Sequence, residues 1–140
     1  MSDLRERILQ ILGQPQLSCL ATVTEEGTPW VRYVVTVTDS DLIIRFASFL
    51  GARKTKQIER NPEVHITCGV AALTDMKPYL QIQGRAHLTT AEQERHGFWN
   101  EMLAPIFDGP DDPKYGVVMV EPYRIEYCSP GSYEPEVWSA

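Results

Sequence analysis

The sequence predicts a mainly β fold, an antiparallel barrel with a few peripheral helices. Short apolar runs rich in β-branched residues recur at close spacing and are separated by turn residues, which is typical of antiparallel barrels. Helical segments are too few and too unevenly placed for a doubly wound parallel sheet. The 140 residues fit one domain with a core large enough to fold unaided, and no repeat marks a boundary. We therefore expect a single domain over residues 1–140.

The first half of the chain reads as a helix followed by a three-strand meander. Apolar residues from Leu4 to Leu12 recur at helical spacing, and Gly13 and Pro15 end the pattern. Turn residues then separate runs of β-branched, small and aromatic residues. The strands are expected at residues 17–24, 30–38 and 42–47.

The second half alternates between helices and strands. A short helix over residues 52–60 ends at Asn61 and Pro62, and the period-two alternation over 78–88 indicates a strand with one buried face. Further elements are a strand over 63–70, a helix from 91 to about 103, and closing strands over 115–120 and 123–128. The tail over 129–140 contains Pro130, Gly131 and Pro135, and we predict that it is irregular.

Charge and hydropathy exclude several classes of function. The formal net charge of −6 argues against nucleic acid as a partner, because such binding requires a basic surface. No apolar run approaches the roughly 20 residues of a membrane span. The first residues carry charges of both signs and lead into a helix, unlike a signal peptide. These observations predict a cytoplasmic protein with no membrane partner.

Cysteine and histidine spacing does not predict a metal site. Cys19, Cys68 and Cys128 are far apart, and each lies in an apolar run where a free cysteine acts as a small hydrophobic residue. The histidines show no pairing at positions i and i+4. The sequence also has no phosphate-binding glycine motif and no G-x-S-x-G elbow, so we name no catalytic residue.

A basic cluster at the start of the 52–60 helix is the strongest local signal. Arg53, Lys54 and Lys56 concentrate there in an acidic chain. A helix N-terminus offers free N–H groups and a positive dipole end, so added cations could form a phosphate clamp. Arg32 and Ser48 could approach the same point. The alternatives are a solvated helix face for the cluster and a solvent-facing strand position for Arg32.

An ordered set of motifs extends from Ile8 to about Tyr127. It comprises Leu20-Ala21-Thr22-Val23, Gly27-Thr28-Pro29-Trp30-Val31-Arg32, Phe46-Ala47-Ser48, Arg53-Lys54, Gln57-Ile58, Asn61-Pro62, Leu80-Gln81-Ile82-Gln83-Gly84-Arg85-Ala86, Phe98-Trp99, Gly109-Pro110-Asp111-Asp112-Pro113 and Val120-Glu121-Pro122-Tyr123. This order resembles the pyridoxamine 5′-phosphate oxidase-like FMN-binding split barrels, in particular their general stress protein subgroup. The strength of the resemblance lies in the order of the set.

The resemblance implies an antiparallel split β-barrel that forms a homodimer with FMN sites at its interface. In that arrangement Arg32, Tyr33 and Val34 line the flavin. Its phosphate is held by Ser48, Arg53 and Lys54. Gln83 lies near the flavin ring, and Trp99 approaches from the other subunit. The alternatives from the residues themselves are an edge polar residue for Gln83 and a helix-packing aromatic for Trp99.

The resemblance further implies a flavoprotein, most simply an FMN-dependent oxidoreductase of unknown substrate, because the flavin would carry the redox chemistry. One alternative is a non-catalytic flavin-binding or stress-sensing module. Others are a split barrel that uses a deazaflavin or haem, and a dimer with no cofactor. The tail Ser132-Tyr133-Glu134-Pro135 lacks the Arg-x-His type motif of authentic pyridoxamine phosphate oxidases, so vitamin B6 oxidation is not predicted.

Overall fold

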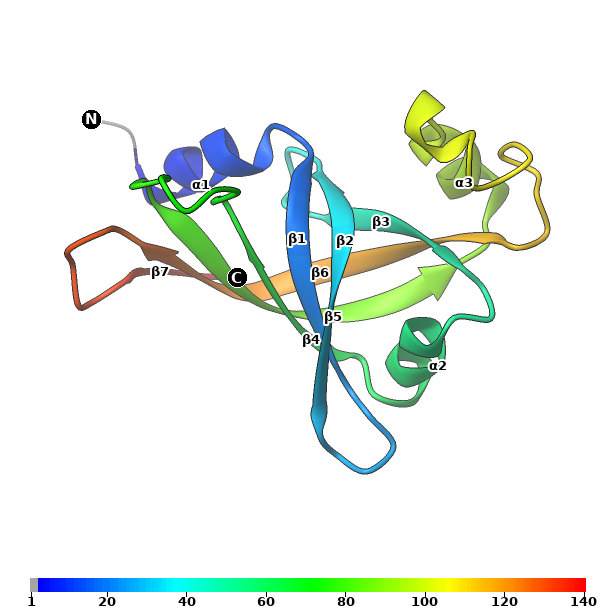
Figure 1. Cartoon of the computed structure of the whole chain (residues 1–140), viewed down its shortest axis with the longest axis horizontal. Helices are drawn as coiled ribbons and strands as arrows, with labels where there is room; N and C mark the ends of the chain where they lie inside the picture. Colours follow the sequence, from blue (N-terminus) through cyan, green and yellow to red (C-terminus); the bar gives the residue numbers. More distant parts are fainter. Residues whose placement is uncertain (1–2) are drawn as a thin grey trace.

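The computed structural model describes residues 3–140 and shows a closed antiparallel barrel (Figure 1). Met1 and Ser2, the first residues of the expected domain and N-terminus, lie outside the described residues. The strand order is β3-β2-β1-β4-β5-β6-β7, and β3 also pairs with β6. That last pairing closes six strands into a barrel and leaves β7 outside it. The predicted fold class, a split β-barrel with peripheral helices, is confirmed.

The predicted helices and strands are present, and most boundaries move by one to three residues. The elements are α1 (Leu4–Leu12), β1 (Gln16–Val23), β2 (Pro29–Thr38), β3 (Ile44–Phe49), α2 (Arg53–Arg60), β4 (Glu63–Cys68), β5 (Tyr79–Thr89), α3 (Glu92–Phe98), the 3₁₀ turn η1 (Glu101–Leu103), β6 (Tyr115–Cys128) and β7 (Glu136–Ser139). None of the helices in residues 3–140 has the length and apolar character that a membrane span requires.

The core fills the barrel because strands such as β1, β3, β4 and β5 bury alternate residues. Along β5 the buried positions are Leu80, Ile82, Gly84 and Ala86, and the residues between them face outward. Helix α1 closes one end of the barrel with the buried side chains of Ile8 and Leu12. A second, smaller cluster lies under the segment between α3 and β6, and consists of Leu103, Phe107, Tyr115 and Val117. We call residues 98–107, the last residue of α3 and the segment after it, the cap; Leu103 and Phe107 are the cap residues that belong to this cluster.

Two elements differ from the sequence prediction in the second half of the chain. The helix expected to run to about residue 103 ends at Phe98, and the Asn100 side chain accepts from the Met102 N–H to start a separate 3₁₀ turn. The two closing strands are one continuous strand, β6. Pro122 lies at a bulge in the β5–β6 pairing, opposite Gly84, so its missing N–H does not break the strand.

The prediction of an irregular tail is wrong for its last residues. Residues 136–139 form β7, which pairs with β6 from Arg124 to Tyr127. The Arg7 guanidinium on α1 donates to both carboxylate oxygens of Glu136, at 2.6 and 2.7 Å. Gly131 has a φ of 79°, a left-handed value that suits glycine, so the turn residues reverse the chain onto the sheet. Residues that indicated irregularity therefore form a turn between two paired strands.

Candidate functional site

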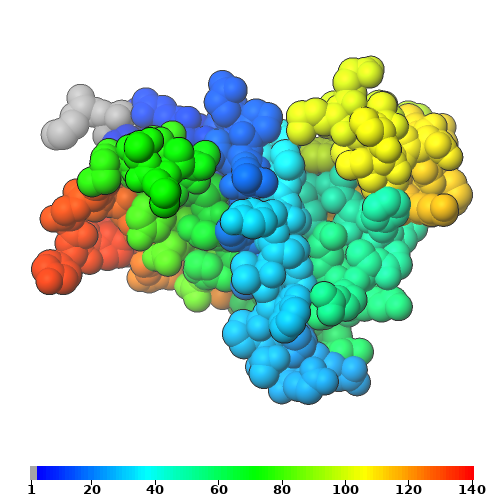
Figure 2. Space-filling view, in the orientation of Figure 1, coloured from blue at the N-terminus to red at the C-terminus, as the bar shows by residue number. Residues whose placement is uncertain are grey.

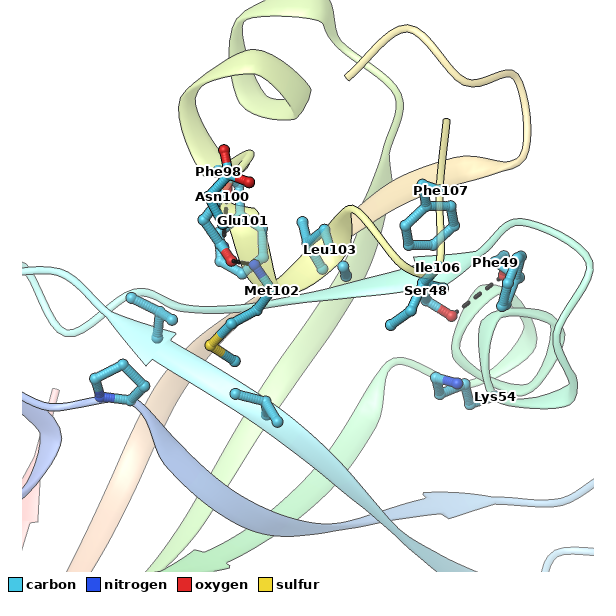
Figure 3. A pocket seen from close by; sticks show the side chains of 14 residues that line it. Ser48, Phe49, Lys54, Phe98, Asn100, Glu101, Met102, Leu103, Ile106 and Phe107 are labelled. Atoms are coloured by element: carbon cyan, nitrogen blue, oxygen red, sulfur yellow. Dashed lines mark hydrogen bonds between the residues drawn. The ribbon is translucent and has the colours of Figure 1, made fainter. Parts of the chain in front are cut away.

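A pocket of about 690 Å³ lies outside the barrel wall, between β2, β3, the start of α2 and the cap (Figure 3). Val34 and Thr36 of β2 are buried in the barrel, so the alternating Val35 and Val37 face outward and form one wall. The cap forms the opposite wall, with Phe98, Met102 and Ile106 among its lining residues. The pocket is largely apolar, and its volume is typical of small-molecule sites.

Lys54 brings a positive charge to the α2 side of this pocket, next to Ser48. Ser48 is buried, and its hydroxyl donates to the Phe49 carbonyl at 3.2 Å. Partial burial lowers the pKa of Lys54, and the nearby positive charge of Arg32 lowers it further. A half-buried ammonium beside another cation is a position that an anion would stabilise.

Arg32 lies behind Lys54 and connects three elements. Its guanidinium donates to the Thr22 hydroxyl of β1 at 2.6 Å and to the Gln57 side-chain oxygen of α2 at 3.0 Å. It also donates to the Trp30 carbonyl at 3.0 Å. Desolvation lowers the pKa of Arg32, and the charge of Arg53 adds to that shift. Arg32 is thus a positioned, partly buried charge and not a freely solvated strand residue.

The start of α2 completes a cationic cluster that we define as Arg32, Arg53 and Lys54. The N-cap residue Ala52 makes no side-chain cap hydrogen bond, and the first turn contains no acidic residue. Within residues 3–140, none of the three cluster cations forms an ion pair with a carboxylate. Free N–H groups and unneutralised cations at one helix end make a binding site for an anion such as a phosphate.

The structure brings only part of the predicted site together in one chain. Ser48 and Lys54 line the pocket, whereas Arg53 lies over the Trp30 ring at 5.5 Å and faces an adjacent groove. Tyr33 projects outward from β2 and is 71% exposed. Val34 is buried in the barrel core, so only its main chain can face a ligand outside the barrel.

Gln83 and Trp99 lie away from the pocket in this chain. Gln83 lines a separate groove on the outer face of β4, β5 and β6, together with His65 and Arg124. Trp99 packs edge-to-face on Tyr115, with ring centroids 5.7 Å apart, and belongs to the cluster beneath the cap. For Trp99 this geometry is that of the packing alternative. A role for either residue at the pocket of another subunit stays a prediction.

Sequence reasoning missed the cap and the outward face of β2. Val35 and Val37 could have been found, because the alternation in residues 30–38 places them on one face. The cap residues Glu101, Met102 and Ile106 gave no signal, since they follow a helix end that the sequence did not mark.

A group of possible metal ligands lies between α3 and the turn before β6. Glu92, His96 and Asp111 each have a ligand atom within 4.8 Å of the others, and all three are exposed. Histidine spacing predicted no metal site. Spacing of this kind does not detect a carboxylate from a distant turn, such as that of Asp111. The hydrogen bond between His96 and Asp111, 2.8 Å long, connects α3 to the turn before β6.

These features define a split β-barrel with a cluster of cations that could bind an anion, next to an apolar pocket. The family model described as pyridoxamine 5′-phosphate oxidase matches residues 4–129, and the chain belongs to that family. This agrees with the resemblance that the ordered motifs predicted.

Known relatives extend over nearly the whole chain. General stress protein 26 of Bacillus subtilis (strain 168) is 29% identical over 133 residues, which cover 95% of this chain and 94% of that protein. The crystal structure of general stress protein 26 from Bacillus anthracis has a TM-score of 0.84 at 25% identity and covers 98% of both chains. A putative pyridoxamine 5′-phosphate oxidase from Listeria innocua has a TM-score of 0.78 at 29% identity, over 89% of this chain and 98% of that one.

Proposed function

We propose that the protein binds FMN and acts as a flavin-dependent oxidoreductase on a small organic substrate. The observation that carries the proposal is the unneutralised cationic cluster at the uncapped start of α2, which adjoins an apolar pocket. A flavin mononucleotide has the matching halves, a dianionic phosphate and a flat, largely apolar ring system.

The residues present fit such a group. Arg53, Lys54 and the free N–H groups of the first α2 turn would hold the phosphate, with Arg32 adding positive charge from behind. Val35 and Val37 offer an apolar wall for the ring, and the cap shields it from water. When bound, the flavin supplies hydride or electron transfer. The chain itself would bind the flavin, orient it and exclude water from it.

We further propose a cytoplasmic homodimer with cofactor sites at its interface. The outer face of β1 and β2 exposes Leu17, Val31 and Tyr33, with exposed fractions of 58%, 62% and 71%. Strand β2, coloured light blue to cyan, lies uncovered on the face shown in Figure 2. An exposed apolar patch of this kind marks an interaction surface.

The register supports a contribution from a second subunit. Val31 pairs with Ala21, Ala21 with His65, and His65 with Gln83, so the four residues form one row across the outer face. Strands β2 and β5 are three strands apart in either direction around the six-stranded barrel, so Val31 and Gln83 lie on opposite sides of its outer wall within one chain. Gln83 could therefore reach a flavin near β2 only from a partner subunit that packs on this face.

Purification tests the proposal. We expect a yellow protein with flavin absorbance, or a colourless one that takes up added FMN, and mass spectrometry of the released ligand separates FMN from a deazaflavin or haem. Anaerobic reduction of the bound flavin by NADH or NADPH then separates an oxidoreductase from a non-catalytic flavin-binding module. A protein that neither carries nor takes up FMN would refute the cofactor assignment.

A further inference from the structure

A histidine and two carboxylates converge where α3 meets the turn before β6. Glu92 and His96 stand at positions i and i+4 of α3, so they share one face of the helix. Asp111 comes from the turn, and its Oδ1 is 2.8 Å from the Nε2 of His96. Each of the three residues offers one ligand atom, and these atoms all lie within 4.8 Å of one another. The group therefore combines an imidazole with carboxylates, which is a donor set that divalent transition metals bind.

The charges around this group favour a cation. Two carboxylates within a few ångströms of each other repel, unless a positive charge lies close to both. In the part of the chain that the structure describes, neither Glu92 nor Asp111 forms an ion pair with a lysine or an arginine. Lys114 follows in the same turn, but it acts on the neighbouring carboxylate of Asp112. A divalent ion would relieve the repulsion between the two carboxylates.

The geometry suits a tetrahedral ion. The turn is fixed by the Asp112 carboxylate, which accepts from the N–H groups of Asp108 and Lys114 at 2.9 Å each. The position of Asp111 is therefore set by its neighbour. Zinc with bonds of about 2.0–2.2 Å separates its ligand atoms by about 3.4 Å. The three side chains are exposed and can rotate to that spacing, and a water molecule would complete the coordination.

The ligand atoms come from both sides of the cap. His96 precedes the cap and Asp111 follows it, and the two residues are 15 positions apart. Helix α3 has no buried residue, and its N-cap Ala91 makes no side-chain cap hydrogen bond. Its anchors are polar contacts such as the ion pair between Arg45 and Glu94, 2.9 Å long. An element with so little buried surface opens at a low cost in free energy, so an added bond at this point would stabilise it.

We propose that Glu92, His96 and Asp111 bind a zinc ion, which joins α3 to the turn before β6 and so stabilises the cap over the pocket. Zinc accepts imidazole nitrogen and carboxylate oxygen together in one tetrahedral site. Because its ligands would come from both sides of the cap, the ion would close a loop around that segment and restrict its opening. None of the three residues lines the pocket, so the inference does not depend on the proposed cofactor.

Isothermal titration of the metal-free protein with zinc chloride tests the site. We expect one Zn²⁺ to bind per chain, and to bind at least about tenfold more weakly in Glu92→Gln and in His96→Gln, since the loss of a group that only supports a ligand already costs about 10- to 100-fold. Glu92→Gln leaves the hydrogen bond between His96 and Asp111 in place, so it separates metal binding from that contact. His87→Gln removes an exposed histidine from β5 and should leave the affinity unchanged.

Hydrogen exchange followed by mass spectrometry tests the effect on the cap. Zn²⁺ should slow amide exchange in peptides that cover residues 98–107 of the unchanged protein and of His87→Gln, but not in those of Glu92→Gln. The site is refuted if the unchanged protein binds no Zn²⁺, or if Glu92→Gln and His96→Gln bind it as tightly. Zinc held by these residues without slower exchange over 98–107 would refute the stabilisation of the cap.

Discussion

Replacement of Lys54 by glutamine removes one charge from the cationic cluster and keeps a polar side chain of similar length. Lys54 lies at the pocket beside Ser48, and no carboxylate in residues 3–140 neutralises it. If FMN places its phosphate there, the substitution removes one charge-assisted hydrogen bond. The affinity for FMN should therefore fall.

The size of the loss follows from charge and distance. A unit charge 4 Å from another contributes about 1 kcal/mol in water, and a phosphate carries about 1.5 to 2 negative charges. The expected loss is about 1.5 to 2 kcal/mol, within the range measured for hydrogen bonds to charged groups. That corresponds to an affinity for FMN that is about 12- to 30-fold weaker.

Quenching of flavin fluorescence on titration measures this affinity, and two controls define its origin. Lys56→Gln removes the same charge from an exposed position that does not line the pocket, and should change the affinity little. Riboflavin has no phosphate, so its affinity should be the same for Lys54→Gln and for the unchanged protein. Equal effects of the two substitutions, or an equal effect on riboflavin, would refute the placement of the phosphate.

The same substitution has the opposite effect on the ligand-free fold. Burial and the Arg32 charge lower the pKa of Lys54 below 10.5, so the folded chain holds this proton less tightly than the unfolded chain. The charge therefore costs folding free energy at neutral pH, and the cost is relieved as pH rises through the lowered pKa towards 10.5. At pH 7, Lys54→Gln should raise the free energy of unfolding slightly, as urea denaturation without ligand would show.

Three further predictions concern the cap, the outer face and the core. Trp99→Ala should lower the free energy of unfolding by about 2 kcal/mol in urea denaturation, because a half-buried ring loses its contact with Tyr115; an unchanged midpoint would contradict this packing role. Tyr33→Asp should convert a dimer to a monomer in light scattering, whereas Tyr133→Asp, in the exposed tail, should not; a dimer that survives Tyr33→Asp would place the interface elsewhere. Burial raises the pKa of Cys68 from 9.0 to about 11, so the folded chain retains a proton that the unfolded chain loses. The free energy of unfolding should therefore fall between pH 9 and about 11, and Cys68→Ala should show a smaller fall over that range; equal slopes would contradict the shift.

Local chemistry explains why so much of the barrel could be predicted. The alternation in β5 and the break at Asn61 and Pro62 are properties of neighbouring residues, and each sets one element. The prediction of an irregular tail was wrong because β7 depends on a contact between Arg7 and Glu136, which are 129 positions apart. No local pattern reports such a contact.

The candidate site was predictable in kind but not in full geometry, for the same reason. The cations that begin α2 are adjacent in sequence, so their proximity to one another is a local property. Gln83 shares the outer sheet face with Val31, but periodicity gives the face of a residue and not its distance across the sheet. Trp99 was placed at the partner subunit's site by resemblance; within its own chain it follows the end of α3 at Phe98 and packs on Tyr115, and its role at a second subunit stays a prediction.

Arg32 links the stability of the barrel to the chemistry of the site. Arg32 lies on the same side of β2 as the buried Val34 and Thr36. Its guanidinium nevertheless donates hydrogen bonds to Thr22 and Gln57, and so attaches α2 to the barrel. The same charge lowers the pKa of Lys54. The fold therefore holds like charges together at the start of α2, and a bound dianion would relieve their repulsion. Because binding to the folded state alone stabilises it by mass action, FMN should raise the melting temperature, and this increase should shrink in any variant that removes a cluster cation.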